Sequence, residues 1–227
     1  MAGIRSARGL ARLCCALATA PLAALSPVLA APLTTSEIAT LCAQAEGAAH
    51  CGQLIEEVQL KRLPNLATRE GAVLKVTLFP SGMAFFTDTE ALNGGRSYSL
   101  WDYIDQINAV LIYTSEGDAV TFTLLQRASG RKIELPAEPK LSPDRQRLVT
   151  ADFCPTRCVN ELAVWRVVRD GVRKESAWKP AESWVDAAAT WTDAETLGIE
   201  YTSAGASKSA LMTRRLADPG WLRAPSP

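Results

Sequence analysis

The sequence of 227 residues contains a single histidine, His50. A Ser-His-Asp or Cys-His catalytic arrangement uses an imidazole as its base, so any such site would have to use this one residue. His50 stands beside Cys51 at the expected start of a helix, and we interpret it as a surface or capping residue. The chain also lacks an EF-hand loop and a nucleotide-binding loop. The sequence therefore indicates no enzyme class, and we expect no cofactor and a non-catalytic role.

An excess of charge of either sign is also missing. The 24 lysines and arginines are balanced by 24 aspartates and glutamates. Domains that bind nucleic acid usually present a clustered basic face. The composition therefore predicts no nucleic-acid partner.

Acidic residues are absent from the first 36 positions, while three arginines lie among the first twelve. An alanine-rich apolar stretch follows over residues 13–25, which is the order of regions in a secretory signal peptide. We therefore expect residues 1–30 to be a signal peptide that is cleaved after Ala30. An uncleaved anchor is the alternative, but a spanning helix needs about 20 apolar helical residues, and Pro21 and Pro27 interrupt this run.

Cleavage at Ala30 would remove three basic residues and leave a slightly acidic chain. The richness in alanine and arginine is typical of GC-rich bacteria. We therefore expect a periplasmic or extracellular protein with no membrane span after cleavage.

Six cysteines are present, and Cys14 and Cys15 would leave with the signal peptide. In an oxidising compartment the remaining four are expected to pair, and four cysteines allow three connectivities. They form two close couples, so the local pairing is the economical one. The predicted disulfides join the residues of each couple: Cys42 with Cys51, and Cys154 with Cys158.

Helical signals are confined to the region before residue 67. Thr34 and Glu37 have the spacing of a capping box, and apolar residues then recur at helical spacing up to Gly47, which we expect to end the helix. A second short helix is predicted over residues 51–60. We therefore expect a helical segment over 31–66, a β domain over 67–217 and a C-terminal tail over 218–227.

From residue 71 onward, short apolar and alternating runs are separated by turn-forming residues. This pattern is typical of an antiparallel all-β domain, and it leaves no room for the crossover helices of a parallel sheet. The predicted fold is mainly β, an antiparallel meander of about twelve short strands after a short disulfide-stapled helical N-terminus. The predicted strands cover residues 73–79, 83–88, 97–102, 109–115, 119–126, 131–135, 147–152, 162–168, 172–178, 186–191, 196–202 and 210–216.

One turn in this region carries a resemblance to a known fold. Leu141-Ser142-Pro143-Asp144, followed by Arg145 and an apolar strand, resembles the L-S-P-D-G hairpin in blades of bacterial β-propellers of the tryptophan-aspartate-repeat type. Residues 191–199 are similar to the same hairpin, residues 79–85 resemble it more weakly, and residues 162–167 resemble a third blade strand. The resemblance implies propeller-like blades and a glycine where this chain has Arg145.

The spacing of these hairpins departs from the propeller pattern. The copies are 63 and 49 residues apart, whereas blades of this type repeat about every 40–45 residues. Three blade-like units are also fewer than the roughly four that a closed ring needs. A partial, open or oligomer-completed propeller and an unrelated antiparallel meander are therefore both compatible with the sequence.

Several short patterns have a chemical interpretation beside a structural one. Ser129 and Lys132 have the S-x-x-K spacing of penicillin-recognising enzymes, but Gly130 places them in an expected hairpin turn. The CxxxC pair could supply soft ligands for zinc or copper together with His50 and the other cysteines. Carboxylate chemistry or calcium binding would use two acidic pairs, which we otherwise expect to be solvated: Asp88 with Glu90, and Asp102 with Asp105.

Six tryptophans are present, and in a sheet protein most serve as large core residues. Trp101, Trp178 and Trp184 flank polar turns and are candidate aromatics of a groove for sugar or peptide. Two other segments, residues 81–85 and 94–98, weakly resemble the S-G-x-x-Y loop of periplasmic lysozyme inhibitors.

These features together predict an exported, soluble binding or interaction protein of the cell envelope. Its partner is expected to be a protein or an envelope glycan, and oligomer formation stays open. The alternatives are a periplasmic hydrolase whose site is assembled from scattered acidic or serine residues, and a lysozyme-inhibitor-like protein.

Overall fold

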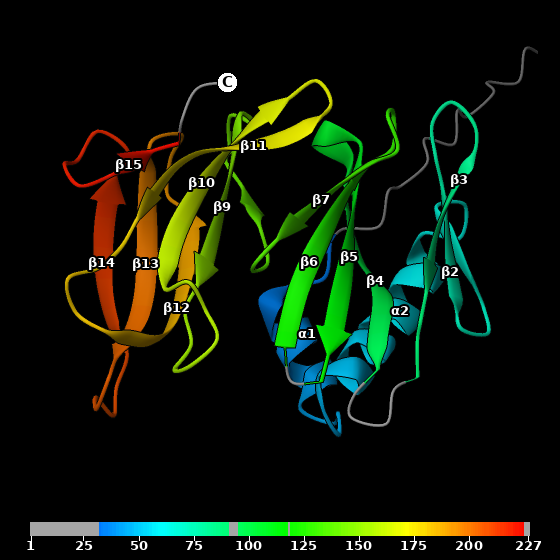
Figure 1. Cartoon of the computed structure of the whole chain (residues 1–227), viewed down its shortest axis with the longest axis horizontal. Helices are drawn as coiled ribbons and strands as arrows, with labels where there is room; N and C mark the ends of the chain where they lie inside the picture. Colours follow the sequence, from blue (N-terminus) through cyan, green and yellow to red (C-terminus); the bar gives the residue numbers. More distant parts are fainter. Residues whose placement is uncertain (1–31, 91–94, 118, 225–227) are drawn as a thin grey trace, which may run out of the picture.

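A computed structural model describes residues 32–90, 95–117 and 119–224. The expected signal peptide, with Cys14, Cys15 and Ala30, lies outside these residues. Within them, two α-helices precede fifteen β-strands in four antiparallel sheets (Figure 1). The prediction of a mainly β, antiparallel protein with a helical N-terminus is confirmed.

The first helix begins as its sequence predicts. α1 spans Thr35–Cys42, the Thr34 Oγ1 accepts a hydrogen bond from the Glu37 N–H at 3.2 Å, and the Glu37 carboxylate accepts one from the Thr34 N–H at 2.7 Å. The prediction that Gly47 ends the first helix was wrong, because α1 ends at Cys42. Gly47 caps the start of the second helix, α2 (Ala48–Arg62), with a φ of 147° that favours glycine.

The predicted bond between Cys42 and Cys51 joins α1 to α2. α2 packs on the two strands over Arg96–Ile104 and Ala109–Glu116 through Ile55, which is fully buried. Gly52 permits this close approach, because a Cβ atom there would lie 2.8 Å from Cδ1 of Tyr113. The helical segment is therefore both stapled and packed onto the β-strands.

The strands follow one another as meanders, and we number the sheets in chain order. The first sheet contains β1 (Ala67–Glu70), β2 (Val73–Thr77) and β3 (Met83–Thr87), and the second contains β4 (Arg96–Ile104), β5 (Ala109–Glu116), β6 (Ala119–Gln126) and β7 (Arg131–Leu135). The third contains β8 (Lys140–Leu141), β9 (Arg147–Asp152), β10 (Glu161–Val168), β11 (Gly171–Trp178) and β15 (Leu222–Arg223). The fourth contains β12 (Trp184–Trp191), β13 (Thr196–Ser203) and β14 (Ala210–Arg215).

Three of these strands, β1, β8 and β15, were not expected from the sequence. β8 and β15 have two residues each, which is too short for an alternating pattern to show. β15 lies in the segment expected as a tail, where Leu222 pairs with Ala177 of β11. Pairing with β11 therefore fixes part of the C-terminal segment.

Three buried clusters connect the sheets in sequence. The first lies between α2, the second sheet and the third, the second between the first two sheets, and the third between the last two. Figure 1 shows the first sheet and the fourth at opposite ends of this row. The described residues thus form an open row of antiparallel sheets, and no closed propeller is observed among them.

Two of the three hairpins that resemble those of propeller blades are stabilised by the same kind of turn contact. The Asp144 Oδ1 accepts a hydrogen bond from the Gln146 N–H at 3.1 Å, and the Asp193 Oδ1 accepts one from the Glu195 N–H at 2.8 Å. Such contacts from an aspartate to the backbone two residues on stabilise tight turns. Arg145 adopts a φ of 61°, the conformation for which the resembling hairpin has glycine.

We expect Arg145→Gly to raise the free energy of unfolding by about 0.5 kcal/mol. A left-handed residue other than glycine costs about 1–2 kcal/mol, and the greater freedom of glycine in the unfolded chain offsets part of this gain. Arg145→Val should lower the same free energy by about 1 kcal/mol, because a branched side chain fits this conformation poorly. Urea unfolding followed by circular dichroism measures both, and a clear loss of stability in Arg145→Gly would contradict the explanation.

Candidate functional site

A cleft of about 690 Å³ lies between the second and third sheets. We call it the inter-sheet cleft. One wall is the start of β6, and the opposite wall is the end of β9 with the loop that follows it. The lining residues are Ala119, Val120, Thr121, Phe122, Pro136, Ala137, Glu138, Ala151, Asp152, Phe153, Cys154, Thr156, Arg157, Cys158 and Val159.

The cleft exists because β7 is shorter than β6. β7 pairs only with residues 122–126 of β6. Pro136 follows directly after β7, at the point where the pairing with β6 ends. The chain turns away through residues 136–138 toward the third sheet, and the start of β6 is left as one wall of the cleft.

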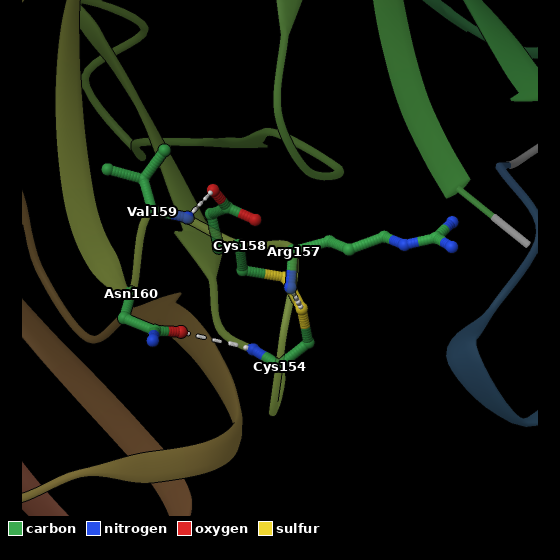
Figure 2. Close-up of a disulfide and its surroundings, with 6 residues drawn as sticks. Cys154, Arg157, Cys158, Val159 and Asn160 are labelled. Atoms are coloured by element: carbon green, nitrogen blue, oxygen red, sulfur yellow. Dashed lines mark hydrogen bonds between the residues drawn. A yellow bond between two sulfur atoms is a disulfide. The ribbon is translucent and has the colours of Figure 1, made fainter.

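The opposite wall is held by the predicted bond between Cys154 and Cys158, which is confirmed (Figure 2). The Asn160 Oδ1 accepts a hydrogen bond from the Cys154 N–H at 3.2 Å, and the Asp152 Oδ2 accepts one from the Val159 N–H at 2.9 Å. These contacts fix both ends of the loop. Its short ring is worth about 2 kcal/mol in the loop-entropy model.

The acidic groups of the cleft already have partners. Burial raises the pKa of Asp152, which accepts the Val159 N–H. The Glu138 Oε1 accepts a hydrogen bond from the Trp101 Nε1–H at 3.0 Å and lies 2.8 Å from the Lys140 Nζ. Each carboxylate of the cleft therefore makes at least one structural contact.

Arg157, which also lines the cleft, differs from these two carboxylates. Its guanidinium has no hydrogen-bond or ion-pair partner among residues 32–90, 95–117 and 119–224, and Figure 2 shows its side chain extending away from the disulfide loop toward the green strands of the second sheet. Beside it, Val159 is 53% exposed, and Phe153 lines the same wall. The cleft thus combines an apolar lining with one available positive charge.

The three candidate groove tryptophans do not lie together. Trp101 is 6% exposed and stacks on Tyr113 with ring centres 4.9 Å apart, in the cluster beneath α2. Trp184 is 4% exposed and belongs to the cluster between the third and fourth sheets, where its ring centre lies 5.5 Å from that of Trp178 in a T-shaped arrangement. None of the three lines the inter-sheet cleft.

The structure does not gather the candidate acidic residues into one cleft. Asp88 lies 2.9 Å from Arg69 in a partly buried ion pair. Burial raises the pKa of Asp102, whose carboxylate accepts the N–H of the next residue. Glu90 and Asp105 are exposed.

The remaining chemical candidates make local contacts. The His50 Nδ1 accepts the Glu46 N–H at 3.2 Å, and the Ser129 Oγ accepts the Arg131 N–H at 3.3 Å. The Lys132 Nζ donates to the backbone carbonyl of Phe85. Within the described ranges, no group of three or more histidine, cysteine, aspartate or glutamate side chains is placed to hold a metal ion.

The first segment that resembles the lysozyme-inhibitor loop, residues 81–85, covers the end of the turn between β2 and β3 and the first three residues of β3. Met83 and Phe85 are exposed on β3, and Phe79 is exposed beside them. The second such segment begins at Gly94, which lies outside the described residues. An inhibitory role stays a prediction.

Sequence reasoning missed Val120, Phe153 and Arg157 as neighbours in one cleft. The available signal was Pro136, which directly follows Leu135, because proline is found mainly at the edges and ends of strands. Neither helix within the described ranges has the length and apolar character required to span a membrane. No known protein-family model, curated protein or solved structure matches the chain.

Proposed function

We propose that this chain is an exported binding protein of the cell envelope that holds its ligand in the inter-sheet cleft. It acts in the periplasm or extracellular space after cleavage near Ala30. The observation that carries the proposal is the apolar cleft of about 690 Å³ with the available guanidinium of Arg157 on its wall. Ligand sites are typically concave, mostly apolar and equipped with a few polar groups that fix orientation.

The state of the other polar groups supports binding over catalysis. Asp152 and Glu138, the carboxylates of the cleft, are held by the Val159 N–H, the Trp101 indole and Lys140. A general base has to lie within reach of the proton that it removes, and these two are occupied by structural contacts. The four meander sheets would then be blade-like units in an open row, with the ligand between the second and the third.

The test uses saturation-transfer NMR with two probe pools and a variant that fills the cleft. The pools are randomised synthetic heptapeptides and chitin-type oligosaccharides of two to six sugars. Ala137→Trp places a large side chain in the cleft lining, and Ala188→Trp places the same side chain in a hollow on the exposed face of β12. We expect at least one pool to show transfer with the parent protein and with Ala188→Trp, and to lose it with Ala137→Trp.

Circular dichroism of both variants checks that each is folded. Absence of transfer from both pools, or transfer that survives in a folded Ala137→Trp variant, would overturn the proposed function.

A further inference from the structure

We propose that the ligand of the inter-sheet cleft is an extended polypeptide segment that adds to the free edge of β6 and places a carboxylate on Arg157. This inference rests on the proposed function and names the class of ligand for the same site.

The edge of β6 offers unpaired backbone groups inside the cleft. Glu116 and Ala119 are partners across the two-residue connection between β5 and β6, and thus close the hairpin. Ladder hydrogen bonds alternate between the two sides of an antiparallel strand. The N–H and C=O of Val120 therefore point to the side where β7 would lie, and β7 reaches only to Phe122 there.

A second short edge lies on the opposite wall. The Ser142 N–H donates to the Arg147 C=O at 2.8 Å, so the backbone groups of Arg147 face β8. The same alternation turns the groups of Ala151 to that side, whereas β8 pairs only with Leu148 and Val149. Both walls of the cleft thus carry outward backbone groups, and a chain with alternating N–H and C=O groups is the ligand that matches them.

Size and side chains agree with a short extended segment. The three residues 119–121 of β6 span roughly 10 Å at the rise of about 3.3 Å per residue in a strand. A segment of four to five residues would cover this edge and reach the disulfide loop. Its alternate side chains would meet the apolar surface of Phe153 and Val159.

The positive charge of Arg157 favours segments that carry a carboxylate. Arg157 has no acidic partner among the described residues, and guanidinium groups bind carboxylates in a bidentate geometry. The carboxylate can come from an acidic side chain or from a chain terminus. An oligosaccharide is a weaker match, because Trp101 and Trp184, which would stack on sugar rings, are buried elsewhere.

The experiment measures retention of heptapeptide pools on the immobilised protein by mass spectrometry. One amidated pool contains a fixed glutamate, a second has glutamine in its place, and a third has glutamine with a free C-terminal carboxylate. A fourth repeats the first pool with N-methylated backbone amides. We expect the glutamate pool, the free-carboxylate pool or both to be retained about tenfold better than the neutral pool, a difference of about 1.4 kcal/mol.

Arg157→Gln should abolish this preference, while Arg169→Gln, at an exposed turn position outside the cleft, should preserve it. Val120→Pro removes the outward N–H and should weaken retention of all pools, and the N-methylated pool should not be retained by the parent protein. The N-methylated pool keeps the test independent of how Val120→Pro folds.

Equal retention of acidic and neutral pools, an unchanged preference in Arg157→Gln, or full retention of N-methylated peptides would overturn this inference. Oligosaccharide binding that Ala137→Trp abolishes, without peptide binding, would overturn the polypeptide ligand and leave the cleft as the binding site. Failure of both probe classes would overturn both proposals.

Discussion

Glu56→Ala is expected to lower the free energy of unfolding by about 3–5 kcal/mol, the usual cost of removing one partner from a buried ion pair. Both carboxylate oxygens of Glu56 lie 2.8 Å from guanidinium nitrogens of Arg69, and Oε2 also accepts the Leu100 N–H at 2.8 Å. The substitution leaves Arg69 with one carboxylate partner, Asp88, and leaves a buried backbone N–H unpaired. Urea unfolding followed by circular dichroism measures the loss.

The neighbouring residue provides a matched control. Glu57 is exposed on the same turn of α2, so Glu57→Ala should change stability by no more than about 0.5 kcal/mol. A loss below about 1 kcal/mol in Glu56→Ala would show that this network does not fasten α2 to β1 and β4.

The sequence predicted the strands well because each is a local pattern. In β3, Met83 and Phe85 are exposed while Ala84 and Phe86 are buried, which is the period of two that identifies a half-buried strand. The expected limits of β6, β7 and β9 also agree with the structure. The capping box at Thr34 was also predictable, because both of its contacts lie within four residues.

The candidate site could not be predicted in this way. The cleft joins the start of β6, the connection after β7 and the disulfide loop, and its shape depends on which sheet faces pack together. The ion-pair network of Arg69 could not be predicted either, because it also joins residues from separate elements. Glu56 and Asp88 lie 13 and 19 residues from Arg69 in the sequence. Gly47 shows that a local signal can also be ambiguous, because glycine suits both the end of one helix and the start of the next.

The cleft can be a fixed site only if the second and third sheets unfold as one unit, and Leu148 tests this condition. Leu148 is 0% exposed on β9 and packs with Leu135 of the second sheet in the cluster shared by both sheets. We expect Leu148→Ala to lower the free energy of unfolding by about 2–5 kcal/mol, because truncating a buried leucine removes apolar contact and leaves a cavity.

Leu211→Ala is the matched control, since Leu211 is 81% exposed on β14 and its truncation should cost less than about 0.5 kcal/mol. Hydrogen exchange measured by mass spectrometry should show β6 and β9 losing protection together in Leu148→Ala. If only β9 and its neighbours in the third and fourth sheets became less protected, the sheets would open separately. The inter-sheet cleft would then be a flexible boundary between two units, and the pre-formed edge of β6 could not hold a peptide against Arg157.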